Sequence, residues 1–260
     1  MNIKKNIPNA ITCGNLLCGC LAIVKCFEGD LVWAAYLVGI ATILDFLDGF
    51  VARLLKVTSP IGKDLDSLAD MVTFGVVPGM VMFKMIQSCY INEFNDNISF
   101  GSLWTGNYKD AQLAYLSFLI PIFSAIRLAI FNNDTRQSDS FIGLPTPANA
   151  ILICSLPLFV NTKTEGLWGC FGYPFYQELI MNQWFLCLLS FILSLLLIAP
   201  IPLFALKFKN ISWTDNKIRF VFLVLSVVLL AVFQFIGIPL IIILYILMSI
   251  VNNIFFKKKV

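Results

Sequence analysis

Eight long apolar runs dominate this chain of 260 residues and constrain its fold more than any other feature. A membrane-spanning helix needs about 20 mainly apolar residues. The composition agrees, because 59% of the residues are hydrophobic and 13% are charged, whereas a soluble domain is about 45–50% apolar and about 25% charged. The sequence therefore predicts an all-α polytopic membrane bundle of about eight transmembrane helices, in a single membrane domain over residues 1–260. The predicted helices cover roughly residues 8–27, 31–56, 60–87, 111–132, 143–161, 180–206, 217–235 and 238–255.

The basic residues predict the orientation of this bundle. With eight spans, fourteen of the eighteen Lys and Arg residues fall on one side of the membrane, together with both termini. The other side keeps only Lys25, Lys84, Lys109 and Lys163. Because cytoplasmic loops carry an excess of Lys and Arg, we expect both termini in the cytoplasm. The first run lacks a small-residue cleavage site, so we interpret it as a retained helix that begins near Pro8 rather than as a signal peptide.

The chain has eight cysteines and no histidine. Without histidine, the usual ligand sets for zinc and haem are missing. Most of the cysteines lie within predicted helices, where a free thiol behaves as a small apolar side chain. A disulfide between Cys89 and Cys170 in the outer loops is conceivable, but their spacing alone does not support it.

Four aspartates, Asp45, Asp48, Asp66 and Asp70, lie inside or at the ends of two of these apolar runs. A charged side chain near a bilayer core costs on the order of 3 kcal/mol even on lenient scales. Each pair shares one face of its helix, because residues three and four apart are neighbours. A hairpin between the two helices would place one pair opposite the other. We therefore expect the carboxylates to share cations, a polar cavity or both at the cytoplasmic surface.

The aspartate cluster indicates phosphoryl chemistry. Carboxylates without histidine or thiolate partners favour hard cations such as Mg²⁺, Mn²⁺ or Ca²⁺. On facing helices they can hold two such ions about 4 Å apart, which clamps both oxygens of a phosphoryl displacement. Two other interpretations are an intramembrane salt-bridge network, which one nearby arginine could not neutralise, and a cation transporter. Clustering at one interface argues against a conducting path, so we favour a phosphate-bearing, partly apolar substrate.

The spacing from Asp45 to Asp70 reads D-x2-D-G-x2-A-R-x8-G-x3-D-x3-D. By this string the chain is similar to the CDP-alcohol phosphatidyltransferase family, which implies displacement of CMP from a CDP-linked lipid by an alcohol at a dimetal centre. The resemblance implies Mg²⁺ or Mn²⁺ as cofactor, with two ions expected and Ca²⁺ able to substitute in binding. The implied metal ligands are Asp45, Asp48, Asp66 and Asp70, of which Asp70 is also the general base. The implied contacts to the CDP-lipid are Asn9, Thr12, Gly49, Ala52, Arg53, Ser59 and Gly62; for Asn9 and Thr12, helix capping is the alternative.

The segments 7–19, 65–75 and 141–147 resemble integral-membrane phosphatidylserine synthases. That resemblance implies L-serine as the acceptor, since Asn15 stands where relatives with phosphate-bearing acceptors more often have arginine. The implied partners are CDP-diacylglycerol, L-serine, membrane lipids and a second copy in a homodimer, with no nucleic acid. The same chemistry on glycerol phosphate, inositol or choline is the alternative.

Serine needs recognition residues of its own. Arg127 is the best candidate for the serine carboxylate, because a guanidinium at the cytoplasmic end of a helix has few other roles. A positive-inside anchor is the alternative for Arg127, and Asn132 and Thr146 are weaker candidates for serine. We expect the protein in a prokaryotic cytoplasmic (inner) membrane with its site facing the cytoplasm. Residues 1–206 would form a six-helix catalytic core and residues 207–260 two additional helices, to which we assign no chemistry.

Overall fold

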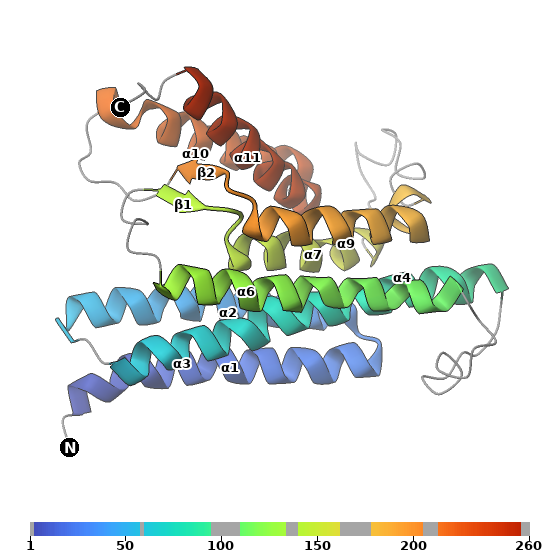
Figure 1. Ribbon diagram of the computed structural model, residues 1–260, viewed down its shortest axis with the longest axis horizontal. Helices are drawn as coiled ribbons and strands as arrows, with labels where there is room; N and C mark the ends of the chain where they lie inside the picture. Colours follow the sequence, from blue (N-terminus) through green and yellow to red (C-terminus); the bar gives the residue numbers. More distant parts are fainter. Residues whose placement is uncertain are drawn as a thin grey trace.

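The computed structural model describes residues 3–57, 60–94, 110–133, 140–161, 178–204 and 213–255. Outside the described residues therefore lie Ser59, Cys170 and residues 95–109, which belong to the connection between the third and fourth predicted helices. The described chain is a bundle of helices with one pair of three-residue strands (Figure 1). The predicted all-α membrane bundle is confirmed, and each of the eight predicted apolar runs contains helix.

The elements follow one another in this order: α1 Ile3–Glu28, α2 Leu31–Leu54, α3 Pro60–Asp70, η1 Met71–Val76, α4 Val77–Phe94, η2 Asp110–Phe118, α6 Leu119–Asn133, β1 Ser140–Ile142, α7 Thr146–Asn161, α9 Gln183–Ile198, β2 Pro202–Phe204, α10 Trp213–Phe233, η3 Gln234–Ile236 and α11 Gly237–Phe255. Within the described ranges, 5 helices are long and apolar enough to cross a membrane. One of these stretches, Asn216–Asn253, covers most of both α10 and α11, while Thr146–Leu158 and Gln183–Ile198 are shorter apolar helices. The number of spans and the sidedness of the termini stay predictions.

Helices α1 and α2 form a tight hairpin that carries one half of the aspartate cluster. Gly29 makes the turn with a φ of 81°, a conformation that only glycine adopts without strain. Asp30 then caps α2, because its carboxylate accepts a hydrogen bond from the backbone N–H of Trp33 at 3.1 Å. The predicted start of the first helix at Pro8 is wrong. Helix α1 begins at Ile3 and Pro8 is its sixth residue, so the helix lacks the one backbone hydrogen bond that an N–H at this position would donate to the Lys4 carbonyl.

The third predicted helix is continuous but not uniform. Six residues directly after Asp70, Met71–Val76, form a π-helical segment between α3 and α4. Such segments are rare and occur often at functional sites, because the extra residue per turn rotates the side chains that follow. Thr73, Phe74 and Gly75 of this segment are buried. The change of helical period therefore occurs in the packed interior, next to the last aspartate of the motif.

A small β-structure closes one end of the bundle. Strands β1 and β2 pair antiparallel, with Phe141 opposite Leu203. The chain enters α7 through Gly143, whose φ is 77° and whose Cβ, if present, would lie 2.4 Å from the Leu197 carbonyl oxygen. Helices α10 and α11 form a hairpin beside this end (Figure 1). The Asn253 side chain of α11 donates a hydrogen bond to the Pro202 carbonyl.

Candidate active site

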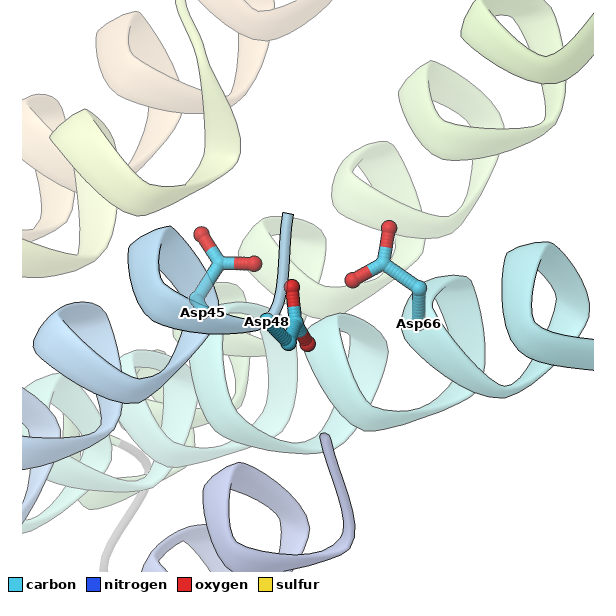
Figure 2. Close-up of side chains that lie close together, drawn as sticks. All are labelled: Asp45, Asp48 and Asp66. Atoms are coloured by element: carbon cyan, nitrogen blue, oxygen red, sulfur yellow. The ribbon is translucent and has the colours of Figure 1, made fainter. Parts of the chain in front are cut away.

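Three of the four aspartates converge on one point. Asp45 and Asp48 come from α2 and Asp66 comes from α3, and one carboxylate oxygen of each lies within 4.8 Å of the others. Figure 2 shows the three carboxyl groups directed toward a common space between the two helices. The helical spacing produces this arrangement, since Asp45 and Asp48 are one turn apart on the side of α2 that faces α3. The predicted meeting of the two helices at these residues is thus observed for Asp45, Asp48 and Asp66.

Thr12 of α1 contacts this cluster through Asp48. Its side chain is 3% exposed, and its hydroxyl lies 2.6 Å from Asp48 Oδ2 and 3.1 Å from the Pro8 carbonyl oxygen. A hydroxyl has one proton to donate, and the shorter, charge-assisted contact takes it. Thr12 therefore orients the Asp48 carboxylate, and it lies far inside α1 rather than at its cap. Asn9 is half-buried one turn earlier on the same helix.

Asp70 lies apart from the three converging carboxylates and has a different partner. It is buried and accepts a hydrogen bond from Asn15 Nδ2 at 3.2 Å. Asn15 is itself fully buried on α1, and its backbone carbonyl accepts a hydrogen bond from the Thr73 hydroxyl at 3.2 Å. These two bonds join α1 to both sides of the boundary between α3 and η1. Asp70 is therefore held in one orientation, next to the cluster but outside it.

The close contact between α1 and η1 requires glycine at position 19. A Cβ on Gly19 would lie 2.4 Å from Thr73 Oγ1 and 3.2 Å from the Thr73 Cα, which is too close for a carbon atom. Without a side chain there, η1 approaches α1 closely enough for Asn15 to reach Asp70. The close packing at Gly19 thus sets the position of the Asn15 side chain, one turn earlier on α1.

The cluster has the donor set of a divalent-cation site. Within the ranges that the structure describes, none of the four aspartates forms an ion pair with Lys or Arg. Asp66 Oδ1 is buried and has no hydrogen-bond partner among those residues, although a buried carboxylate oxygen without a partner is costly. Converging carboxylate oxygens without nitrogen or sulfur donors suit Mg²⁺ or Mn²⁺. The residues present therefore fit a hard divalent ion held by Asp45, Asp48 and Asp66.

The predicted CDP-lipid residues of α2 border an open space. Apart from its chain neighbours and the backbone of its own helix, Gly49 has no atom within 4 Å of the position that a Cβ would take, so a ligand can approach the backbone there. Arg53 is exposed, and its Nε donates a hydrogen bond to the Gly49 carbonyl at 3.0 Å. Its guanidinium therefore lies over the last turns of α2. Ala52 and, on α3, Gly62 are partly buried.

The residues predicted for serine separate into two groups. Arg127 of α6 is 7% exposed, and its Nη1 lies 3.4 Å from the Thr146 hydroxyl at the start of α7. Helix α6 packs against η1, the segment that begins directly after Asp70. Asn132 lies elsewhere, since its Nδ2 donates to the Ser67 hydroxyl of α3 at 2.8 Å. Arg127 and Thr146 therefore belong together, whereas Asn132 joins α6 to α3.

Two polar residues near the aspartates were not predicted to contact the site, although the sequence had singled out Asn15 as a sign of an acceptor without phosphate. Asn15, the partner of Asp70, lies three residues after Thr12, so the one-turn spacing on α1 was the signal available. Ser67 lies on α3 between two motif aspartates, and its own hydroxyl donates to the Lys63 carbonyl at 3.2 Å. Its contact with Asn132 depends on how α6 crosses α3, which residue spacing along one helix does not reveal.

Comparison with known proteins places the chain in a family. The family model described as CDP-alcohol phosphatidyltransferase matches residues 5–196. A protein of Helicobacter pylori (strain J99) is 32% identical over 241 residues, which cover 85% of this chain and 93% of that protein. A protein of Bacillus subtilis (strain 168) is 33% identical over 164 residues, 63% of this chain and 82% of that protein. Both relatives are named CDP-diacylglycerol–serine O-phosphatidyltransferase. The chain therefore belongs to the CDP-alcohol phosphatidyltransferase family.

Proposed function

We propose that this protein transfers a phosphatidyl group from CDP-diacylglycerol to L-serine, giving phosphatidylserine and CMP. The convergence of Asp45, Asp48 and Asp66 carries the proposal, because it supplies a carboxylate site for divalent ions where the family motif requires one. The names of the relatives support serine as the acceptor. The proposed location is a prokaryotic cytoplasmic membrane with the site on the cytoplasmic side, in line with the distribution of basic residues.

The proposed cofactor is Mg²⁺ or Mn²⁺, held by Asp45, Asp48 and Asp66. Two ions are proposed, and Asp70 would also contact the second one. When bound, the ions stabilise negative charge on the diphosphate and on the departing CMP. Thr12 keeps the Asp48 carboxylate in one orientation through the 2.6 Å hydrogen bond. Gly49, Ala52, Arg53 and Gly62 would border the cytidine diphosphate, with Asn9 and Ser59 assigned there by family resemblance only.

Asp70 would act as the general base. Its Oδ1 accepts the hydrogen bond from Asn15, so the other carboxylate oxygen is available for the proton of the serine hydroxyl. As that proton moves to Asp70, the serine oxygen forms a bond to the lipid-side phosphorus and the bond from phosphorus to the CMP oxygen breaks. A positioned base contributes about 10²–10⁴-fold to such a step. No covalent bond to the protein is required.

Arg127 and Thr146 would bind the serine carboxylate. The Arg127 guanidinium is buried on α6, which packs against the segment that follows Asp70, so an acceptor bound to Arg127 would have its hydroxyl on the side of the base. Within the described part of the chain, Arg127 Nε has no hydrogen-bond partner. A buried guanidinium N–H without a partner is costly, and a carboxylate of the acceptor would satisfy it. Asn132 would contribute indirectly at most, through Ser67.

The direct test is an assay of the purified chain with CDP-diacylglycerol, labelled L-serine and Mg²⁺ or Mn²⁺. We expect equal amounts of phosphatidylserine and CMP, and no product when EDTA is present. A parallel set of glycerol phosphate, inositol and choline tests the acceptor. Product from one of these and none from serine would refute the assignment of serine, while divalent-ion uptake into proteoliposomes with no transfer to any alcohol would refute the enzyme.

A further inference from the structure

The buried polar groups of α7 include one that the site described above does not use. Asn149 is fully buried, and both polar atoms of its side chain, Oδ1 and Nδ2, have no hydrogen-bond partner among the described residues. A buried amide group without a hydrogen bond is costly, because it has lost its contacts with water and gained nothing in return. A carboxamide with both ends unpaired inside a packed bundle therefore indicates a polar ligand.

Asn149 is adjacent to the residues proposed to bind the acceptor carboxylate. It follows Thr146 by three residues on α7, so the two side chains lie on one side of the helix with their Cβ atoms about 5–6 Å apart. Thr146 in turn contacts the Arg127 guanidinium. Asn149 therefore lies one helical turn along α7 from the contact between Thr146 and Arg127.

The facing helix α6 shows the same pattern one turn from Arg127. Ser124 is fully buried, and its hydroxyl has no partner within the ranges described. Helices α6 and α7 run in opposite directions, since the chain turns back through β1 (Figure 1). Ser124 and Asn149 therefore both lie one helical turn farther from the β1 connection than Arg127 and Thr146 do. Both helices also pack against η1, where Ser124 lies next to Gly75, so unsatisfied polar atoms at one level of the two helices fit a ligand held beside that segment.

We propose that Asn149 is a specificity-determining residue of the acceptor site, which reads the α-amino group of the amino acid acceptor; this rests on the proposed function. An ammonium group is a donor only and a carboxylate an acceptor only, whereas a carboxamide offers both functions. Asn149 Oδ1 accepts a hydrogen bond from the ammonium, and Nδ2 donates to the carboxylate that Arg127 binds. This pairing satisfies both ends of Asn149 and the Arg127 Nε–H at once.

The test uses L-serine and 3-hydroxypropionate, which keeps the hydroxyl and the carboxylate of serine but lacks its amino group. Initial rates are measured with the purified full chain at saturating CDP-diacylglycerol, for wild type and Asn149→Leu. We expect the KM for serine to rise about 10- to 100-fold, because a hydrogen bond to a charged group is lost. The KM for 3-hydroxypropionate should rise less, because that acceptor loses only the Nδ2 bond to its carboxylate. The preference for serine should therefore fall, with the KM for CDP-diacylglycerol unchanged.

The matched control is Ser155→Ala on the same helix, because Ser155 is buried and its hydroxyl donates to the Leu152 carbonyl at 2.7 Å. This variant should keep both KM values. If Asn149→Leu does not fold, Asn149→Ser gives the same reading, since it also removes both amide groups. An unchanged preference for serine, or an equal loss with both acceptors, overturns the role of Asn149. A wild-type chain that makes no phosphatidylserine refutes the proposed function instead, and the role of Asn149 with it.

Discussion

Replacing Thr12 by valine tests whether the hydrogen bond from α1 controls the metal site. Valine has nearly the shape of threonine, so Thr12→Val removes the hydroxyl without leaving a cavity. The lost contact is the 2.6 Å hydrogen bond to Asp48 Oδ2. A hydrogen bond to a charged group contributes about 1.5–3 kcal/mol, and about 1.4 kcal/mol is a factor of ten in an equilibrium constant. Partners that orient a metal ligand typically change metal affinity about 10- to 100-fold.

We therefore expect the Mg²⁺ concentration that gives half-maximal CMP release to rise about 10- to 100-fold in Thr12→Val. The rate at saturating Mg²⁺ should change much less. Thr42→Val of α2 is the matched control, because the Thr42 hydroxyl donates only within its own helix, to the Val38 carbonyl at 2.9 Å. Thr12→Ser keeps a hydroxyl at this position and should show the same half-maximal Mg²⁺ concentration as wild type. If Thr12→Val and wild type show the same Mg²⁺ dependence, the proposed orientation of Asp48 is wrong.

Three further changes test other parts of the site. Asp70→Asn should lower kcat about 10²–10⁴-fold, the usual contribution of a general base, and wild-type turnover in this variant would exclude that role. Gly19→Ala should lower the free energy of unfolding of the purified protein by about 1–3 kcal/mol, and with it the melting temperature, because its Cβ would lie 2.4 Å from Thr73 Oγ1. Gly39→Ala, where nothing lies within 4 Å, should be neutral or stabilising, so equal melting temperatures would contradict the packing argument. Arg127→Lys should raise the KM for serine about tenfold, because an ammonium cannot reproduce the fork of guanidinium donors; a higher KM for CDP-diacylglycerol instead would remove Arg127 from the acceptor site.

Helical spacing predicted the central part of the site well. Asp45 and Asp48 are three residues apart and lie on one face of α2, so only the hairpin partner had to be inferred. Asp66 met them because the chain turns back after α2 and both α2 and α3 pack against α1. The two C-terminal helices, α10 and α11, were also visible as apolar runs, since a spanning helix needs about 20 such residues. These properties depend on local spacing, which a sequence displays directly.

The partners of Asp70 depend on features that spacing along one helix does not show. The π-helical segment Met71–Val76 has the same apolar composition as an α-helix would have, so its period could not be predicted. The bond from Asn15 to Asp70 requires close contact between α1 and η1, which the missing side chain of Gly19 permits. Contacts of this kind are set by the depth and rotation of one helix against another.

Binding of Mn²⁺ to the purified chain, followed by electron paramagnetic resonance, tests most directly whether the converging carboxylates form a metal site. The account predicts that wild type binds Mn²⁺, that CDP-diacylglycerol tightens the binding, and that Asp66→Asn loses it. Asp64→Asn is the matched control, since Asp64 is exposed on the same helix, and it should bind as wild type does. Equal Mn²⁺ binding by wild type and Asp66→Asn would contradict the account.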